Sequence, residues 1–360
     1  MTSSARARWT LSVLTIPQRE QYLAQLLESL SDSRLPKGTV VDVVYNWDTR
    51  EPPHDVERRL RKASRGLVLN VHFNMQRPTI GCGRVQQLNH CKTPLIAFID
   101  DDITIHGNVL EVVEETMRRL PMGIVGVQSL VEDSNRRFKP RRSTPSVDHD
   151  DMRFMPVQGM FVAGYRRLLL DIGGFNPRRE FWGEWTELNL RMWRSGFPSG
   201  YAMDGAYLRH WEAAPNSPTR NMTGREDHVL WGLLCTALEY EAVDEHEDSH
   251  AFWDLVEQRY IKYAFGEDAR VRDLLRSALR LSPRLSAEYP AISQFRELVR
   301  AHPFQFKPFH RFTERDVSRV LAHANSRISG YRDEVWSSTP SASMNWVRRN
   351  LLRRKDRSVA

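Results

Sequence analysis

The chain has 360 residues, of which 41% are hydrophobic and 27% charged, a composition that is typical of a globular protein and excludes a disordered one. No apolar stretch approaches the roughly 20 residues needed to span a bilayer, and the N-terminus lacks the apolar segment of a secretory signal. Its three cysteines make neither a disulfide framework nor a Cys-x-x-Cys metal pair, so we expect a reducing, cytoplasmic location.

The net charge of +7 is concentrated at one end of the chain. Residues 346–360 hold six basic residues and one Asp, which leaves only +2 for the other residues. A nucleic-acid-binding protein would carry a basic face within its fold, so we expect no nucleic-acid partner. The tail has apolar residues on one side of a basic helix. A weak peripheral contact with the inner face of a membrane is therefore one expectation, and a solvated terminus is the other.

Strand and helix patterns alternate along residues 9–128. Short β-branched or aromatic runs predict strands, and apolar residues at helical spacing predict helices between them. The predicted strands are 9–14, 40–45, 67–71, 95–99 and 124–128, and the predicted helices are 20–30, 56–63, 81–90 and 108–119. This order predicts an α/β fold with a Rossmann-like, mostly parallel sheet flanked by helices.

The rest of the chain divides into a loop, a second group of motifs and a helical region. Residues 132–151 carry basic and then acidic side chains, which predicts either a lid over an anionic ligand or a solvated surface loop. The pattern is helical from residue 229 onward. The predicted organisation is an α/β domain over 1–225, a helical C-terminal region over 226–345 and a basic tail over 346–360.

The strand at 95–99 ends directly on three carboxylates, Asp100, Asp101 and Asp102. Its continuous apolar run predicts a buried central strand. Open α/β sheets bind ligands beyond the carboxyl ends of their strands. Three adjacent negative charges are tolerable there if a divalent cation lies among them, and such a cation commonly brings a phosphate-bearing substrate. A polar turn between a strand and a helix is the alternative.

A second group of motifs lies between residues 159 and 210. A Gly-rich apolar strand leads to Gly173-Gly174-Phe175, and His210 follows the short run Tyr207-Leu-Arg. A helix that begins at Glu184 would place Glu184, Glu187 and Arg191 on one face. The helix dipole stabilises carboxylates in such a first turn. An ordinary exposed ion-pair face would have the same pattern.

Taken in this order, the motifs resemble the GT-A glycosyltransferases, and family 2 in particular, over residues 9–215. The acidic cluster matches the metal-binding Asp-x-Asp motif at Asp100 and Asp102, and His210 matches the late His that often completes the metal site. The Gly-Gly-Phe turn and the helix from Glu184 match two further family motifs. The resemblance implies a GT-A fold with a helical C-terminal extension, a nucleotide-sugar-binding and catalytic domain over 1–225, and Mn²⁺ or Mg²⁺ as cofactor.

One departure from the family pattern concerns the catalytic base. Family 2 commonly has an Asp directly after the Glu of that helix, and here the position is Trp185. The base is therefore reassigned to Glu184, with Glu187 as the second choice. The segment 182–193 is also similar to that of polypeptide N-acetylgalactosaminyltransferases, which retain anomeric configuration and use no such base.

The donor is expected to be held by residues near the ends of the strands. The loop after the first strand is where such folds clasp the nucleoside, and the second strand ends near the nucleobase. A side chain on the helix before the acidic cluster could meet a phosphate, although a surface cation is the alternative at that position. The predicted donor-contact residues are Thr15, Pro17, Arg19, Asn46, Asp48, Arg84 and Asp101.

The predicted function is metal-dependent transfer of a sugar from a nucleotide-diphosphate sugar, UDP-linked by default, to a hydroxyl of a small molecule or glycan. In the inverting version Glu184 removes the acceptor proton, whereas an ion pair with Arg191 would lower the basicity of Glu187 and suits it to orientation. The alternatives are a retaining glycosyltransferase of the same fold, a sugar nucleotidyltransferase and a non-catalytic sugar-binding protein. A nucleotidyltransferase needs a Gly-rich phosphate loop, which residues 15–19 lack.

Overall fold

The computed structural model describes residues 8–47, 55–76, 78–127, 129–131, 136–137, 146–155, 157, 159–177, 179, 183–203, 206–210 and 313–336. Several predictions fall outside these ranges: the position of Asp48, most of the loop at 132–151, the tail at 346–360 and most of the helical region at 226–345.

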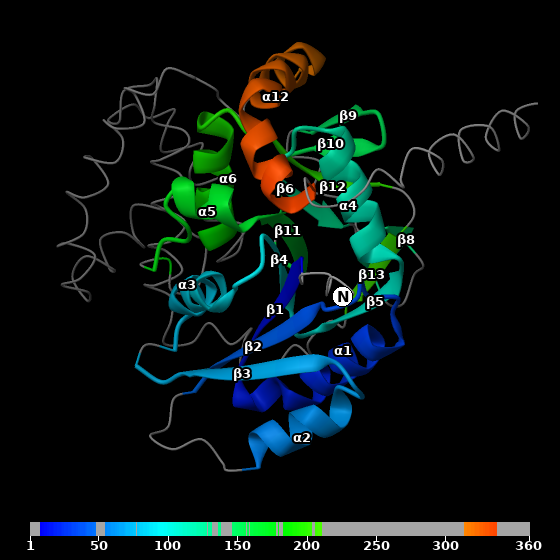
Figure 1. The fold of residues 1–360 in the computed structure, drawn as a ribbon, viewed down its shortest axis with the longest axis vertical. Helices are drawn as coiled ribbons and strands as arrows, with labels where there is room; N and C mark the ends of the chain where they lie inside the picture. Colours follow the sequence, from blue (N-terminus) through cyan, green and yellow to red (C-terminus); the bar gives the residue numbers. More distant parts are fainter. Residues whose placement is uncertain are drawn as a thin grey trace, which may run out of the picture.

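Within the described residues, nine strands form one sheet in the order β3-β2-β1-β4-β11-β6-β12-β10-β9 (Figure 1). The neighbours β3-β2-β1-β4 are parallel, whereas β11 runs antiparallel to both β4 and β6. The predicted mostly parallel, Rossmann-like sheet is confirmed. The strands are β1 (Trp9–Thr15), β2 (Val40–Asn46), β3 (Val68–Asn74), β4 (Leu95–Asp100), β6 (Ile124–Val127), β9 (Val147–His149), β10 (Met152–Phe154), β11 (Phe161–Tyr165) and β12 (Ser199–Ala202).

A smaller sheet has the order β5-β13-β7-β8 and is built from β5 (Ile103–Gly107), β13 (Ala206–His210), β7 (Ser129–Val131) and β8 (Arg136–Arg137). The sequence analysis did not predict β5, although its Ile-Thr-Ile-His alternation is that of a half-buried strand. The strands β13 and β5 are antiparallel, and His210 pairs with Ile103. This register brings the end of β13 next to the acidic cluster.

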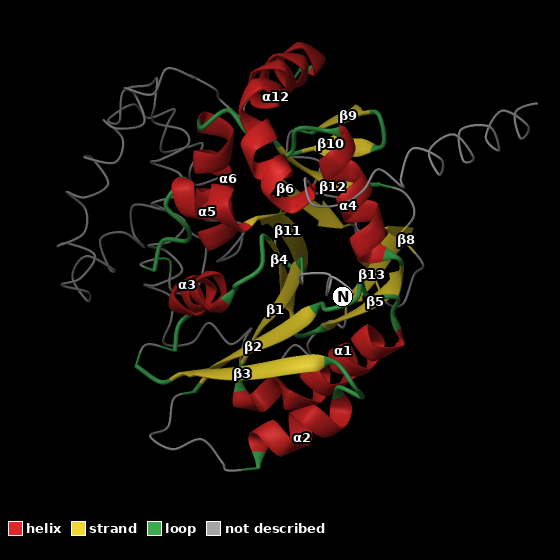
Figure 2. Cartoon of the chain, viewed as in Figure 1, coloured by secondary structure: helices red, strands yellow, loops and turns green. Residues whose placement is uncertain are grey.

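The helices are α1 (Glu20–Asp32), α2 (Val56–Ala63), α3 (Ile80–His90), α4 (Val109–Arg119), α5 (Arg166–Asp171), α6 (Glu184–Arg194) and α12 (Glu314–Trp336), with a short 3₁₀ helix η1 (Pro17–Arg19). The four helices predicted before residue 120 all form. The ends of α2 are as predicted, and those of the other three differ from the prediction by at most two residues. In α1 the buried residues are the predicted apolar stripe, Leu23, Leu26, Leu27 and Leu30. Figure 2 shows α3 and α6 on one side of the sheet and α1 and α4 on the other.

The helix α12 packs back on the α/β domain (Figure 1). The Tyr331 hydroxyl donates to Asp171 of α5 at 2.8 Å, and Arg332 Nε donates to the Met117 carbonyl of α4 at 3.1 Å. The α12 segment is therefore anchored to two helices of the domain. Among the described residues, no helix is long and apolar enough to cross a membrane.

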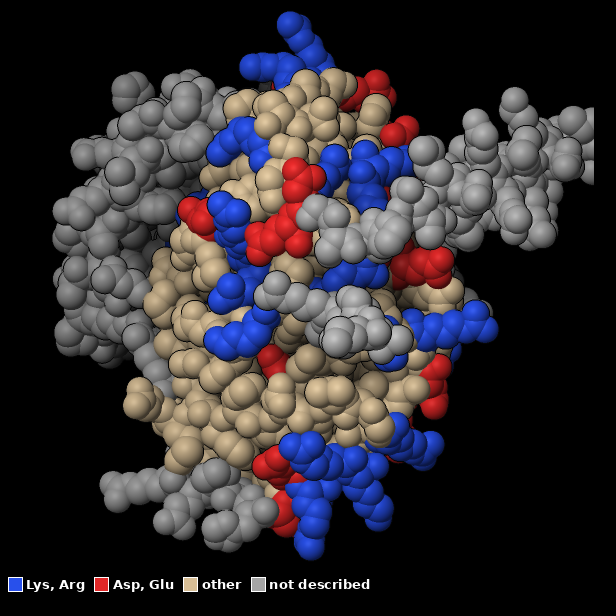
Figure 3. Space-filling view, in the orientation of Figure 1, with Lys and Arg blue, Asp and Glu red and all other residues tan. Residues whose placement is uncertain are grey.

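Charged side chains of both signs are spread over the face shown in Figure 3, and positive ones gather at the end formed by α2. Arg59 is paired with Glu20 and Asp55, and Arg61 with Glu57. Exposed pairs of this kind contribute little to stability. Part of the positive charge over α2 is therefore paired, and the absence of a nucleic-acid partner stays a prediction.

Candidate active site

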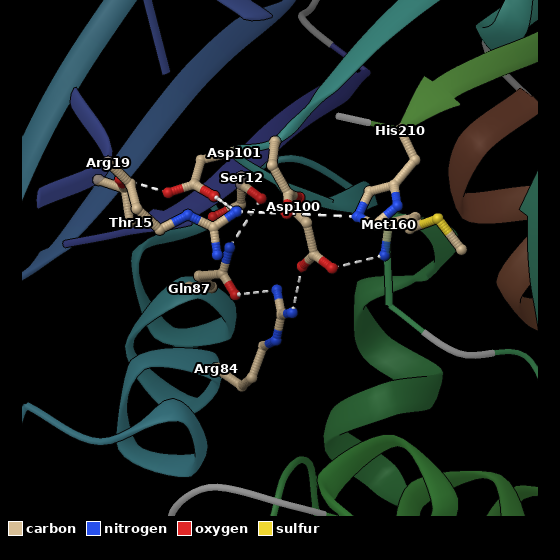
Figure 4. Close-up of polar contacts among 10 residues, drawn as sticks. Ser12, Thr15, Arg19, Arg84, Gln87, Asp100, Asp101, Met160 and His210 are labelled. Atoms are coloured by element: carbon tan, nitrogen blue, oxygen red, sulfur yellow. Dashed lines mark hydrogen bonds and ion pairs between the residues drawn. The ribbon is translucent and has the colours of Figure 1, made fainter. Parts of the chain in front are cut away.

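The three carboxylates lie at the carboxyl end of β4, where β1, η1, α3, β13 and Met160, the residue before β11, also contribute side chains or backbone groups (Figure 4). The run from Leu95 to Ile99 is buried because β4 is hydrogen-bonded between β1 and β11 in the middle of the sheet. The chain therefore delivers Asp100, Asp101 and Asp102 from a fully packed strand, at the sheet edge where open α/β folds bind ligands.

Asp101 is held by the last residue of β1 and the last residue of η1. The Thr15 hydroxyl donates to its Oδ2 at 2.6 Å, and Arg19 Nη2 lies 2.7 Å from its Oδ1. Burial raises the pKa of Asp101 to about 7, and the neighbouring Asp102 and Asp100 add to this effect while Arg19 and Thr15 oppose it. Thr15 and Arg19 thus bind a carboxylate in this structure, and their contact with a nucleoside stays a prediction.

Asp102 has a different set of neighbours. Arg19 Nη2 pairs with its Oδ2, and His210 Nε2 lies 3.3 Å from the same oxygen. Burial acts to raise the pKa of Asp102, but the contacts with His210 and Arg19 outweigh it, so the pKa is lowered and the carboxylate is ionised at neutral pH. Each polar contact that the described residues make with the Asp102 carboxylate falls on Oδ2.

Asp100 is fixed by both of its carboxylate oxygens. Arg84 Nη2 donates to Oδ1 at 2.6 Å, and the Met160 backbone N–H donates to Oδ2 at 2.8 Å. Gly159 makes this approach possible, since a Cβ there would lie only 2.7 Å from Asp100 Oδ2. Arg84 is 4% exposed and also donates to Gln87, whose amide donates to the Ser12 carbonyl. The alternative of a surface cation at Arg84 is therefore wrong.

Glu184 is the first residue of α6 and lies near the same cluster. The helix begins after Gly183, whose φ of 83° favours glycine. Burial raises the pKa of Glu184, as does Asp100, while Arg84 and a backbone N–H hydrogen bond lower it. A buried carboxylate with a raised pKa near charged groups is a typical general-base candidate.

Glu187 is held in an ion pair that supports the fold. Arg191 Nε and Nη2 donate to its two oxygens at 2.5 and 2.7 Å, and the same guanidinium donates to the carbonyls of Ile172 and Gly174. The expected ion pair is therefore present, and it ties α6 to the Gly-Gly-Phe turn. This arrangement agrees with an orienting role better than with proton abstraction.

Replacing Arg191 with Ala should destabilise the fold by about 3–5 kcal/mol, because it leaves the charge of Glu187 buried and unpaired. Glu187 is only 2% exposed. The free energy of unfolding in urea would measure the loss. Arg61→Ala is a matched control, since Arg61 makes the same i, i+4 pair with Glu57 at the surface and should leave the midpoint nearly unchanged. Equal losses in the two variants would contradict the assignment.

Two further residues were predicted to contact the nucleoside, Pro17 and Asn46. Pro17 is the first residue of η1. Asn46 is 5% exposed and uses its amide inside the fold: Nδ2 donates to the Thr79 carbonyl at 3.0 Å, and Oδ1 accepts from Asn74 at 2.7 Å. The structure therefore gives Asn46 a role in joining β2 to β3 and to the start of α3, and its contact with a nucleobase stays a prediction.

The sequence analysis missed several groups at the site. These are Gln87, the Met160 backbone N–H and the indole of Trp185, which packs against Arg84 with the Arg84 Cζ 5.3 Å from the ring centroid. A backbone donor leaves no signal in a sequence. The sequence analysis named Trp185 as a departure from the family pattern and did not predict its contact with Arg84. Within the described residues, no three His, Cys, Asp or Glu side chains gather as a complete metal-binding group.

The fold is that of an α/β protein with its candidate site at the carboxyl edge of a central sheet. The chain belongs to the glycosyltransferase-like family 2, whose model matches residues 10–231, well over half of the sequence. The predicted resemblance is confirmed, and the protein is a glycosyltransferase with a GT-A fold. No curated protein sequence matches the chain.

Solved structures similar to this chain are distant. TarS from S. aureus is 16% identical with a TM-score of 0.49, and the match covers 92% of this chain, 55% of the longer TarS chain and 90% of TarS 1–349. The mannosyltransferase PcManGT from Pyrobaculum calidifontis, in complex with GDP-Man and Mn²⁺, is 15% identical with a TM-score of 0.49, and 93% of this chain and 89% of that chain are covered. GalNAc-T7 is 10% identical with a TM-score of 0.45, and 78% of this chain and 58% of that chain are covered.

Proposed function

We propose that this protein transfers a sugar from a nucleotide-diphosphate sugar, with a UDP-sugar as the default donor, to a hydroxyl group of a small molecule or glycan. The observation that supports the proposal is that Asp102 contacts both His210 and Arg19 at one edge of the sheet, while Glu184 lies near Asp100 of the same acidic cluster. These groups supply negative charge for a cation, positive charge for a phosphate and a base for a hydroxyl. The set therefore contains a group for the donor diphosphate, for the cation that stabilises the leaving group and for the acceptor hydroxyl.

The donor atoms around Asp102 fit a divalent cation. A carboxylate oxygen and an imidazole nitrogen lie 3.3 Å apart, and the second oxygen of Asp102 carries no polar contact from a described residue. Mg²⁺ is usually bound by one or two carboxylates and completes its shell with water and phosphate oxygens, so a complete protein cage is not needed. Asp102 and His210 would hold Mn²⁺ or Mg²⁺, and the bound ion would stabilise the departing diphosphate as a Lewis acid.

The remaining groups of the site divide the other tasks. Arg19 would supply positive charge to the diphosphate, and in the structure it is paired with Asp101 and Asp102. Glu184 accepts the proton of the attacking hydroxyl in an inverting reaction. A retaining reaction on the same fold is the second candidate, because Trp185 stands where the family commonly has its base.

Nucleotide and metal binding can be tested before any acceptor is known. We expect the unfolding temperature to rise in the presence of one nucleotide sugar together with Mn²⁺, and to rise less with either alone. At a ligand concentration 100 times its dissociation constant, binding to the native state adds about 2.7 kcal/mol of stability. Thermal shifts measured with UDP-, GDP- and dTDP-sugars, each with and without Mn²⁺, would identify the donor class.

Two outcomes of this panel carry different meanings. A shift with GDP- or dTDP-sugars in place of UDP-sugars would change the donor and keep the reaction. No shift with any nucleotide, with or without Mn²⁺, would overturn the proposed function. Slow hydrolysis of the responding donor would in turn exclude a non-catalytic sugar-binding protein, since hydrolysis needs an assembled catalytic site.

A further inference from the structure

Trp185 is the second residue of α6 and packs deep inside the domain. It is 5% exposed, and its ring lies edge to face against Phe98 of β4 and Phe175 of the Gly-Gly-Phe turn, with centroids 5.5 and 5.0 Å apart. The family pattern commonly has a carboxylate at this position. Here the side chain is an indole that packs beside the acidic cluster, and one of its charged neighbours is a guanidinium.

The guanidinium belongs to Arg84, which contacts an aromatic ring, a carboxylate and an amide. The indole of Trp185 lies 5.3 Å from the Arg84 Cζ, Asp100 Oδ1 accepts from Nη2 at 2.6 Å, and Gln87 Oε1 accepts from Nη1 at 3.1 Å. An aromatic face attracts a guanidinium, and more strongly when water is excluded. With Arg84 4% exposed, water is nearly excluded here, so the ring fixes the plane of the guanidinium.

The carboxylates at the two ends of the cluster consequently differ. Both oxygens of Asp100 accept hydrogen bonds, one from Arg84 and one from the Met160 N–H, whereas every polar contact that the described residues make with Asp102 falls on Oδ2. A Cβ on Gly159 would lie 2.7 Å from Asp100 Oδ2 and 3.2 Å from Trp185 Nε1, which leaves this side of Asp100 little room. Asp100, although its side chain is 31% exposed, is therefore oriented by the fold through both oxygens. The Asp102 side chain is 10% exposed, and the described residues leave one of its oxygens without a polar contact.

We propose that Trp185 and Arg84 are positioning residues. They hold Asp100 in hydrogen bonds to Arg84 and the Met160 N–H, so that Asp102 and His210 are the residues that bind the cation. This inference depends on the proposed function, and it departs from the sequence prediction that Asp100 is itself a metal ligand. In this scheme Trp185 occupies the helix position that commonly holds the catalytic base in family 2, and here this position has a positioning role. Its ring keeps Arg84 on Asp100, and Asp100 keeps the start of β11 in register through Met160.

The test separates cation binding from turnover. Binding of Mn²⁺ in the presence of UDP would be followed by the electron paramagnetic resonance signal of free Mn²⁺, and turnover would be measured with the donor identified by thermal shifts. We expect Asp102→Asn to weaken Mn²⁺ binding by about 10- to 100-fold. Asp100→Asn and Trp185→Phe should leave Mn²⁺ binding close to that of the wild type while lowering kcat by about 10-fold or more.

A double variant and a matched control complete the design. Because Trp185 acts through Asp100, the double variant Trp185→Phe, Asp100→Asn should lose no more turnover than Asp100→Asn alone. Trp193→Phe removes another buried indole of α6, one that donates to Ser199, and should leave both Mn²⁺ binding and kcat unchanged. Arg84→Lys keeps the charge without the planar guanidinium, and it gives a second variant if Trp185→Phe unfolds.

The outcomes separate the inference from the proposed function. The inference is overturned if Asp100→Asn weakens Mn²⁺ binding as much as Asp102→Asn does, or if Trp185→Phe and Arg84→Lys both turn over normally. If the wild-type protein binds Mn²⁺ with none of UDP, GDP and dTDP, the proposed function itself fails. If it binds with one of them and the variants behave as described, both stand.

Discussion

Replacing Asp102 with Asn is expected to lower the rate of sugar transfer by about 10³-fold, because losing this charge removes about 4 kcal/mol of stabilisation from the departing diphosphate. Asp102 is ionised, lies 3.3 Å from His210 and has all its described polar contacts on one oxygen. The substitution keeps the shape of the side chain and its contact with Arg19. We therefore expect the protein to fold, with an unfolding temperature close to that of the wild type.

The measurement is kcat/KM at saturating Mn²⁺ and again over a range of Mn²⁺ concentrations. Asp32→Asn is a suitable control, since Asp32 is exposed at the end of α1. This substitution removes the same charge outside the acidic cluster. Full turnover by Asp102→Asn would reject a role for this carboxylate in binding the cation. A loss that high Mn²⁺ concentrations restore would locate the defect in cation binding, as the proposal requires.

Much of the sheet was predictable because several of its strands have a recognisable local sequence pattern. The runs at 9–14, 40–45 and 95–99 are β-branched and apolar, and each of them forms a strand of the expected sheet. The direction of β11 was not predictable in this way. Its apolar sequence fits a parallel or an antiparallel neighbour of β4 equally well, and the choice depends on the connection through β5, α4 and β6.

The site was predictable where its residues lie next to one another in the chain. The three carboxylates follow β4 without a spacer, so their place at the edge of the sheet follows from the strand itself. His210 lies 108 positions from Asp102 and reaches it only through the pairing of β13 with β5, a strand that the sequence analysis did not include. The family resemblance supplied His210. The contacts of Arg84 with Trp185 and Asp100 depend on packing among α3, α6 and β4, which no local pattern encodes.

Replacing Glu184 with Gln is expected to lower kcat by about 10²- to 10⁴-fold, the usual range for loss of a general base. The proposed base must be ionised to accept a proton, so activity should fall as the pH is lowered through the pKa of Glu184. Burial raises this pKa above the ordinary value of 4.5, which places the acid limb of the pH–rate profile of the wild type above the usual range for Glu. Glu184→Gln should lack that limb.

Glu187→Gln provides the matched comparison, since it removes a carboxylate from the same face of α6, one turn away. Its main effect should be on stability, because Arg191 loses its charged partner while the carbonyls of Ile172 and Gly174 remain. The anomeric configuration of the product then decides between the two mechanisms. If Glu184→Gln and Glu187→Gln both turn over normally and the product keeps the configuration of the donor, the reaction is retaining. In that case the replacement of the family's usual base by Trp185 reflects a mechanism that requires no base at this helix.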